Sequence, residues 1–190
     1  MKEGKIIYFD RPGGQNTSAV VEAVRERCSE LGIGHVVVAS DSGETALKLW
    51  EALRGSGVKI VSIAGYAGGD EPSIGPERIR ELEEKGIEVL ICSHALSGVE
   101  RSITNKFGGV SRVEIIAHTL RLFGTDGLKV AVEVAVMAAD AGLIPTDREV
   151  ISVGGSGGGA DTAVVLKAAH MNNFFDLEVR EIIAKPRQRR

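Results

Sequence analysis

Aromatic residues make up only 4% of this 190-residue chain, and it has only two cysteines, Cys28 and Cys92. The cysteines lie far apart and lack metal-ligand spacing, which argues against a disulfide framework and a cysteine-based metal site. Both lie in apolar segments, where a thiol packs as a small hydrophobic group. Few rings are available to stack on a planar ligand. Tyr66, in a glycine-rich loop, is a candidate for stacking, and shielding of that loop is its alternative role.

An excess of one charge is also missing. The chain has 23 Lys and Arg against 26 Asp and Glu, and a net charge of −3 argues against a general nucleic-acid binder. No apolar run is long enough to cross a bilayer, and no apolar signal segment follows Met1. We therefore expect a cytoplasmic protein with neither nucleic-acid nor membrane partners. Basic residues gather only at 185–190, where a frayed, solvated tail is expected.

The first half of the chain alternates short apolar runs with amphipathic segments. In the first amphipathic segment, Val20, Val24 and Cys28 recur on one face, as a helix requires. Alternating strands and helices are typical of a parallel sheet with helices on both faces. The expected strands cover 5–9, 35–39, 58–63 and 87–92, and the expected helices cover 17–31, 43–53 and a segment that opens at Pro76 and closes at Gly86.

The second half departs from this alternation. Residues 93–102 are polar and irregular, whereas 111–123 has the apolar spacing of a helix. Residues 128–141 are ambiguous, because their valines alternate as in a strand while Met137 and the residues up to Gly142 are typical of a helix end. We interpret this stretch as a buried helix and keep a strand as the alternative.

A glycine-rich connection joins the last two expected strands, at 149–153 and 163–166. Such a short connection suits an antiparallel hairpin better than a helical crossover. The chain is therefore predicted to be a single three-layer α/β/α domain over residues 1–190, with a mostly parallel sheet and an antiparallel C-terminal hairpin. The apolar stretch 128–143 could serve either its core or the face of a homo-oligomer.

One stretch combines a strand end, a tight turn and a helix start. The valines at 36–38 lead into Ser40-Asp41-Ser42-Gly43-Glu44-Thr45. Backbone N–H groups at such a turn point outward, and the helix dipole adds partial positive charge. Together with the hydroxyls they suit an anion such as a phosphate. On this motif alone, simple capping of the helix by Ser40 or Ser42 is the more conservative interpretation.

Ligands of open α/β sheets bind beyond the carboxyl ends of the strands. In this chain the loops at those ends are also rich in glycine and hydroxyl groups, so several loops point to one ligand site. The glycines of 154–159 permit close approach to a ligand, although a flexible hairpin tip is equally compatible, and no helix follows them as a dinucleotide fingerprint requires. The loops cover 10–17, 40–45, 64–70, 93–101 and 154–162.

His94 follows the fourth expected strand, where an imidazole can act as a general base or form a hydrogen bond with a ligand. A hydrogen-bonded structural histidine is the alternative. Cys92 is close in sequence, but it ends an apolar strand and is expected to be an inert buried thiol. The spacing of the four histidines indicates no metal site.

Three segments, Asn16-Thr17, 36–46 and 149–165, resemble the C-terminal, effector-binding domain of pyruvate kinase. In that domain a Ser- and Gly-containing turn after a strand holds an effector phosphate, and a later glycine-rich hairpin closes over it. The resemblance implies the same roles for 40–45 and 154–162. The catalytic residues of pyruvate kinase lie in its other domains, so the resemblance implies no phosphotransfer.

The whole chain is similar to a group of small stand-alone prokaryotic proteins related to that domain. The shared segments are Leu96-Ser97-Gly98, Met137-Ala138-Ala139-Asp140, Gly159-Ala160-Asp161-Thr162-Ala163 and Asn172-Asn173-Phe174-Phe175-Asp176. This resemblance implies bound flavin mononucleotide (FMN), with its phosphate in the 40–45 turn and its ring near the other loops. The loop that follows the third strand differs from the pattern of the group.

These observations predict a protein that binds a phosphorylated ligand, FMN by preference, and that could be a flavin-dependent oxidoreductase with His94 as its acid–base group. The alternative is a non-catalytic sensor of a sugar phosphate or nucleotide. A homo-oligomer is expected in either case. The expected cofactor-binding residues are Asn16, Thr17, Ser40, Asp41, Ser42, Gly43, Thr45, Tyr66, Ser97, Gly154, Gly155, Ser156, Gly159, Asp161 and Thr162.

Overall fold

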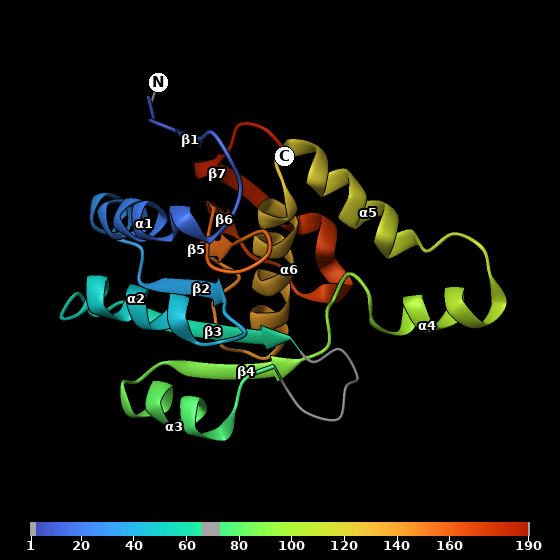
Figure 1. Cartoon of the computed structure of the whole chain (residues 1–190), viewed down its shortest axis with the longest axis horizontal. Helices are drawn as coiled ribbons and strands as arrows, with labels where there is room; N and C mark the ends of the chain where they lie inside the picture. Colours follow the sequence, from blue (N-terminus) through green and yellow to red (C-terminus); the bar gives the residue numbers. More distant parts are fainter. Residues whose placement is uncertain (1–2, 66–72, 190) are drawn as a thin grey trace.

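The computed structural model describes residues 3–65 and 73–189, whose strands form one seven-stranded sheet of order β1-β7-β6-β5-β2-β3-β4 (Figure 1). The strands are β1 (Ile7–Phe9), β2 (His35–Ala39), β3 (Lys59–Gly65), β4 (Glu88–Cys92), β5 (Glu149–Gly154), β6 (Thr162–Lys167) and β7 (Glu178–Pro186). The α-helices are α1 (Thr17–Leu31), α2 (Glu44–Leu53), α3 (Pro76–Glu84), α4 (Gly98–Phe107), α5 (Arg112–Leu120) and α6 (Asp126–Asp140). Short 3-10 turns are η1 (Gly14–Asn16), η2 (Arg121–Phe123) and η3 (Met171–Asp176).

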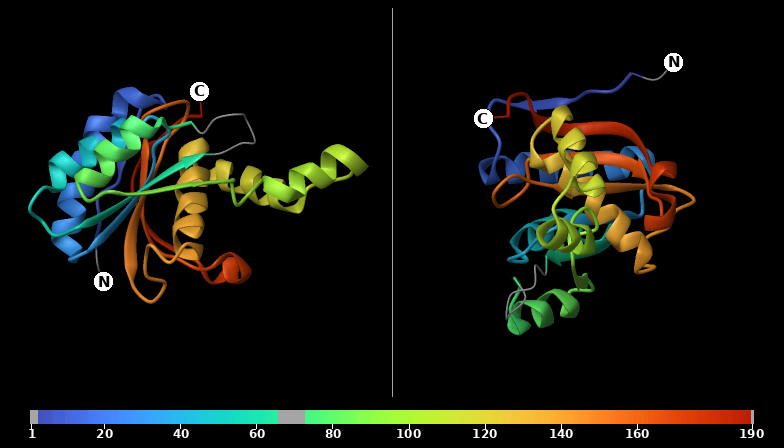
Figure 2. Two further views of the ribbon diagram at one scale, coloured as in Figure 1. Left: turned by 90° about the horizontal axis from the view of Figure 1, so that it is seen from below. Right: turned by 90° about the vertical axis from the view of Figure 1, so that its right-hand side faces the viewer.

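Helices cover both faces of the sheet, and the valines of β2 show how. Side chains alternate along a strand, so Val36 and Val38 pack into the core under α1, α2 and α3, whereas Val37 packs on the opposite side, against α6. Figure 2 shows α1, α2 and α3 on one side of the sheet and α6 on the other. The predicted three-layer α/β/α architecture is therefore confirmed.

Helix α6 occupies the stretch whose pattern was ambiguous, so the interpretation as a helix is confirmed. Val132, Val134 and Val136 are at most 4% exposed although they lie on different sides of the helix. A helix that is apolar all round is a buried helix, and this enclosure explains why its valines imitate the alternation of a strand. Residues 128–139 therefore belong to the core, with Val130 half-buried, whereas the end of the stretch at 140–142 is exposed.

The C-terminal part contains the predicted antiparallel hairpin of β5 and β6 and one strand that was not predicted, β7. Strand β7 lies between β6 and β1, antiparallel to the first and parallel to the second. The expected frayed tail is therefore wrong for its first residues, because Lys185 and Pro186 complete β7. The N–H group of Arg187 then donates to the carbonyl of Phe9 at 2.8 Å. Backbone hydrogen bonds therefore hold residues 185–187 in place, although basic side chains made this segment resemble a solvated tail.

Helices α4 and α5 form an arm that extends from the body of the domain (Figure 2). The helix expected over 111–123 is confirmed as α5 followed by η2. The expectation of irregular structure at 93–102 is wrong for its second half, because α4 begins at Gly98. No residue of α4 is buried. The sequence therefore lacked the pattern of core-facing apolar residues by which a helix is predicted.

Gly127 lies where α6 meets the hairpin. A Cβ atom at this position would be 2.2 Å from Oγ1 of Thr162 and 2.3 Å from Oδ1 of Asp161. We predict that Gly127→Ala lowers the free energy of unfolding by roughly 2 kcal/mol, because overpacking forces the helix away from the hairpin. Urea unfolding measures this loss. Gly34→Ala is the control, since no heavy atom lies within 4 Å of the added Cβ, and equal stability of the two variants would contradict the predicted clash.

Candidate ligand site

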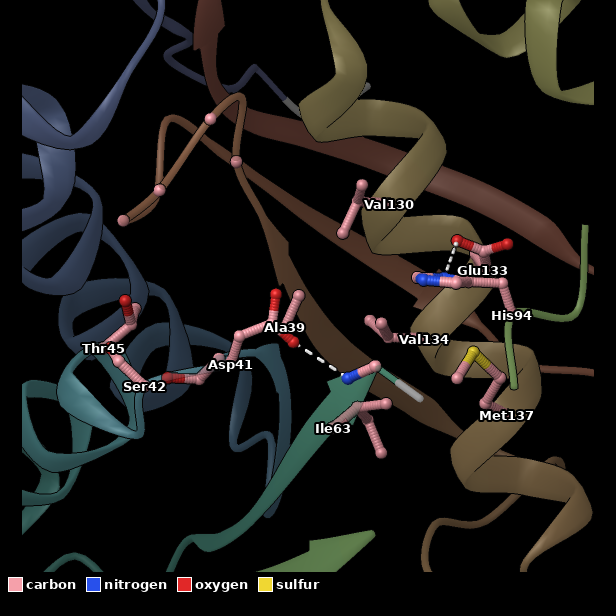
Figure 3. A pocket seen from close by; sticks show the side chains of 16 residues that line it. Ala39, Asp41, Ser42, Thr45, Ile63, His94, Val130, Glu133, Val134 and Met137 are labelled. Carbon is pink, nitrogen blue, oxygen red and sulfur yellow. Dashed lines mark hydrogen bonds and ion pairs between the residues drawn. The ribbon is translucent and has the colours of Figure 1, made fainter. Parts of the chain in front are cut away.

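A pocket of about 470 Å³ opens at the carboxyl ends of β2, β3 and β4 (Figure 3). Its volume is within the range of small-molecule sites. Four of the five loops expected at this edge contribute to it, and α6 adds a wall that was not predicted. The lining residues are Ala39, Ser40, Asp41, Ser42, Thr45, Ile63, Gly65, His94, Val130, Glu133, Val134, Met137, Gly155, Gly157, Gly158 and Gly159.

The serines between β2 and α2 line the pocket and contact the first turn of the helix. The hydroxyl of Ser40 accepts from the N–H of Ala46, and that of Ser42 accepts from the N–H of Glu44, each at a long 3.4 Å. The N-cap residue of α2 is Gly43, which forms no side-chain cap hydrogen bond, so the interpretation that Ser40 or Ser42 simply caps the helix is not confirmed, and these two long hydrogen bonds are weak. The N-terminus of α2 keeps its positive end toward a pocket that Ser42 and Thr45 line. The hydroxyls of Ser42 and Thr45, together with this helix terminus, can therefore receive an anion.

Two residues fix the shape of this turn. Gly43 has φ 78°, a left-handed conformation that favours glycine, and a Cβ there would be 2.8 Å from Cγ of Arg78. Oδ1 of Asp41 accepts from the N–H of Gly65 at 2.8 Å and from the hydroxyl of Ser73 at 3.0 Å. The carboxylate of Asp41 therefore joins the turn after β2 to the end of β3. Gly43 shapes the turn without lining the pocket.

The glycine-rich hairpin is held in place from behind by the first loop. The hydroxyl of Thr17 donates to the carbonyl of Gly14 at 2.6 Å and accepts from the N–H of Ala160 at 2.9 Å. The buried carboxylate of Asp161 accepts from the N–H of Gly13 at 3.0 Å. These contacts support the base of the hairpin, while its glycines 157–159 face the pocket.

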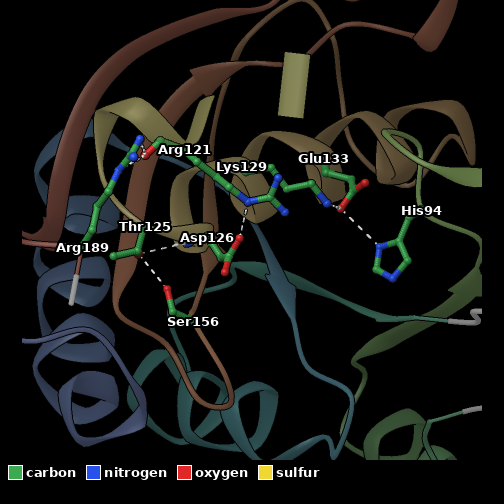
Figure 4. A network of polar contacts seen from close by, with 9 residues as sticks. His94, Arg121, Thr125, Asp126, Lys129, Glu133, Ser156 and Arg189 are labelled. Atoms are coloured by element: carbon green, nitrogen blue, oxygen red, sulfur yellow. Dashed lines mark hydrogen bonds and ion pairs between the residues drawn. The ribbon is translucent and has the colours of Figure 1, made fainter. Parts of the chain in front are cut away.

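A buried carboxylate positions the histidine of the pocket (Figures 3 and 4). Glu133 on α6 is 1% exposed, and its Oε2 contacts Nδ1 of His94 at 3.2 Å and also Nζ of Lys129. Its Oε1 accepts from the N–H of Leu96 at 2.9 Å. Glu133 thus joins α6 to the loop after β4 and holds Nδ1 of His94, and none of the residues that the structure describes forms a hydrogen bond with Nε2 of that ring.

The charge state of this cluster follows from its contacts. Burial by itself raises the pKa of Glu133, but the hydrogen bonds from His94, Lys129 and the N–H of Leu96, with the charge of Lys129, lower that pKa to about 2. Glu133 is therefore ionised at neutral pH. Cys92 is half-buried rather than buried as expected, but partial burial, with a smaller contribution from Glu133, still raises the pKa of its thiol, which stays protonated at neutral pH.

The pocket has two chemically different ends. Hydroxyls and backbone groups from the turn after β2 and from the hairpin gather at one end. At the other, Val130, Val134 and Met137 form an apolar wall on α6 beside His94 (Figure 3). A ligand with an anionic end and a planar or apolar end matches this division.

Comparison with known families identifies the fold. The family model described as "Pyruvate kinase, alpha/beta domain" matches residues 18–166, most of the chain, including the turn after β2, α6 and the hairpin. The chain belongs to this family. The matched range includes all of the residues that line the pocket.

Solved structures similar to this family member include two of pyruvate kinase from Cryptosporidium parvum. The first is 15% identical over 80% of this chain, with a TM-score of 0.43. The second is that kinase in complex with ADP, 16% identical over 78% of this chain, with a TM-score of 0.37. The chain spans less than a quarter of either kinase, 23% and 22% of their lengths.

The predicted cofactor-binding residues divide into those that line the pocket and those that do not. Ser40, Asp41, Ser42, Thr45, Gly155 and Gly159 line the pocket, together with His94. Tyr66 lies outside the described residues. The others lie outside the lining, where several hold the walls in place: Asn16, Thr17, Gly43, Ser97, Gly154, Ser156, Asp161 and Thr162.

Sequence reasoning missed the contribution of α6. The pattern of apolar residues assigned this helix to the core, which is correct for most of its sides. The available signal was Lys129 and Glu133, four residues apart in an otherwise apolar helix. Such charges are buried only when paired, and a paired charge in a core helix points to a polar neighbour from elsewhere in the chain.

Metal sites and membrane-spanning helices were also considered in the described residues. Across residues 3–65 and 73–189, no group of three or more His, Cys, Asp and Glu side chains is arranged to hold a metal ion. No helix within those residues has both the length and the apolar character to span a membrane.

Glu133→Gln tests the buried cluster. We predict a loss of about 3 kcal/mol in the free energy of unfolding at pH 7, because Lys129 is left buried without its counter-charge. The folded pKa of Glu133, about 2, is below the ordinary 4.5, so its contribution is complete above pH 4.5. The stabilisation by ionised Glu133 is lost as the pH falls toward 2. The free energies of unfolding of wild type and Glu133→Gln should therefore become equal there.

Urea unfolding at a series of pH values measures this convergence. Glu22→Gln is the matched control, because Glu22 pairs with Arg25 on the exposed surface of α1. A surface pair contributes little to stability, so the control should follow the wild type at every pH. A constant difference between Glu133→Gln and wild type down to pH 2 would contradict the ionised, buried state of Glu133.

Proposed function

We propose that this chain binds a small phosphorylated ligand, FMN by preference, in the pocket at the carboxyl ends of β2, β3 and β4. The observation that carries the proposal is the convergence of four separate loops and α6 on one pocket of about 470 Å³. Membership of the pyruvate kinase alpha/beta domain family supports the fold on which this site depends. The division of the pocket into a polar and an apolar end supports a ligand of the shape of FMN.

The residues present fit FMN in three respects. Ser42 and Thr45, with the first turn of α2, supply hydroxyls and N–H groups for its phosphate. The backbone of 157–159 would close over that phosphate. The apolar side chains of α6 would face its ring. Asp41 repels a phosphate placed beside it and suits a hydroxyl of the sugar chain, which places the phosphate on the Ser42 side of the turn.

FMN supplies its own redox chemistry when it is bound, so the chain need only hold it, orient it and manage a proton. His94 is the group suited to the proton. Glu133 holds Nδ1 of the ring, and Nε2 is therefore the atom that accepts or donates a proton at the pocket. The buried carboxylate fixes the ring orientation as in other histidine–carboxylate pairs. The enzymatic form of the proposal is a flavin-dependent oxidoreductase.

The test of ligand binding is an absorption spectrum of the freshly purified protein, followed by an FMN titration of Ser42→Asp. We expect a flavin band in the wild type, or uptake of added FMN. We expect an affinity loss of roughly a hundredfold in Ser42→Asp, because a carboxylate then faces the phosphate.

Ser29→Asp, on the exposed end of α1, is the matched control and should bind as the wild type does. Equal affinities of Ser42→Asp and wild type would contradict the assignment of the phosphate to this turn. A colourless protein that takes up no FMN but is stabilised by sugar phosphates or nucleotides would favour the non-catalytic sensor.

His94→Gln tests the proton-transfer role. We expect FMN to bind with unchanged affinity, while the rate at which a nicotinamide nucleotide reduces the bound flavin falls roughly a hundredfold, a typical contribution of a general acid–base group. Anaerobic stopped-flow absorption measures this rate. Reduction at the same rate in both proteins would contradict the role of His94. Failure of the wild type to be reduced would leave binding, without catalysis, as the function.

A further inference from the structure

The pocket carries few charges, and their sum does not favour an anion. Among the described residues, no lysine or arginine lines it, whereas two carboxylates do, those of Asp41 and Glu133. The charge of Glu133 is balanced by Lys129, which donates to it. Asp41 is bonded instead to an uncharged group, the N–H of Gly65. With His94 neutral, the described lining therefore carries one unbalanced negative charge, that of Asp41.

The segments around the pocket do little to offset this charge. The hairpin lines the pocket with glycines only, and the sequence of 66–72 contains two acidic residues and no lysine or arginine. Arg78 lies beside Gly43, outside the described lining, and its guanidinium is paired with Glu81 at 2.8 Å. An anion is therefore left with hydroxyls, N–H groups and the N-terminus of α2, whose dipole amounts to about half a unit of positive charge.

Asp41 lies between the turn proposed to hold the phosphate and the histidine of the pocket. A Cβ atom on Gly65 would be 3.5 Å from Oδ1 of Asp41 and 3.1 Å from Nε2 of His94, so both side chains reach the end of β3. Figure 3 shows Asp41 between Ser42 and His94. A ligand that extends from the Ser42 end toward the apolar wall of α6 therefore passes the carboxylate of Asp41.

We propose that Asp41 restricts this pocket to ligands that carry a single phosphate next to hydroxyl groups. The phosphate is received by Ser42, Thr45 and the first turn of α2, and the backbone of 157–159 closes its other side. A second phosphate joined to the first would then lie beside Asp41, with no lysine or arginine in the described lining to offset the repulsion. A hydroxyl at the same place donates to the carboxylate instead.

This inference rests on the proposed function and narrows its ligand. The class that fits is the phosphate monoester of a polyol, to which FMN belongs. Ligands with two joined phosphates, such as flavin adenine dinucleotide (FAD) and nucleoside diphosphates, are excluded. Asp41 thereby acts as a specificity-determining residue, in addition to joining the turn after β2 to the end of β3.

The first test compares inorganic phosphate with pyrophosphate, at one pH and one ionic strength, by thermal-shift titration of the full chain. We expect the wild type to bind phosphate roughly tenfold more tightly, because repulsion by Asp41 opposes the second phosphate. In Asp41→Asn, which keeps an oxygen for the N–H of Gly65, this preference should disappear. Glu44→Gln is the matched control. It removes a carboxylate from the first turn of α2, outside the described lining, and should keep the wild-type preference.

The second test needs no variant and compares FMN with FAD, which carry the same ring. We expect the wild type to bind FMN roughly tenfold more tightly than FAD, because FAD joins a second phosphate to the first. Fluorescence titration of each flavin measures the two affinities. Should Asp41→Asn fail to fold, as judged by circular dichroism, the comparisons in the wild type decide the question.

The outcomes separate this inference from the proposed function. The restriction is wrong if the wild type binds pyrophosphate as tightly as phosphate, if it binds FAD as tightly as FMN, or if a folded Asp41→Asn keeps the preference for phosphate. Ligand binding at the pocket would still stand in those cases. If FMN does not bind, but Asp41 still sets a preference for phosphate over pyrophosphate, FMN is the wrong ligand and the restriction holds. Failure of all four probes to bind would overturn both.

Discussion

Helix α6 approaches the sheet so closely that a Cβ atom on Gly154 would be 2.3 Å from the carbonyl of Gly127. This close packing decides how the rest of the site is built. It brings the buried face of α6 under the carboxyl ends of the central strands and places Glu133 within reach of the loop after β4. The pocket then forms between α6 and the hairpin, with apolar side chains on one wall and glycine backbone on the other.

A buried carboxylate is costly unless each of its oxygens is satisfied. Glu133 meets that requirement with three groups, Lys129 on its own helix and His94 and the N–H of Leu96 in the loop after β4, so a polar cluster persists inside an apolar core. The cluster has a structural effect, because it fastens the loop after β4, and a chemical one, because it orients an imidazole at the pocket. Both effects come from the same hydrogen bonds, which is why tests of stability and of proton transfer are needed together.

The sequence was sufficient for the elements whose pattern is local. The valines of β2, the turn at 40–45 and the glycine-rich hairpin are contiguous, and their joint position at one sheet edge follows from the topology of parallel strands. Strand β7 and helix α4 were missed, because the first is placed by backbone pairing and the second buries no residue. The α6 wall was missed because a pattern of buried residues does not distinguish a core contact from a pocket wall.

The central claim is that the 40–45 turn and the glycine hairpin hold one ligand between them. The most direct measurement is a titration of the isotope-labelled protein with FMN, followed through its backbone amide NMR signals. The account predicts that the signals of 42–45, of 157–159 and of the loop that carries His94 shift together, with one dissociation constant. Shifts confined to other surfaces, such as the groove beside Trp50, or shifts in only one of the two loops, would contradict it.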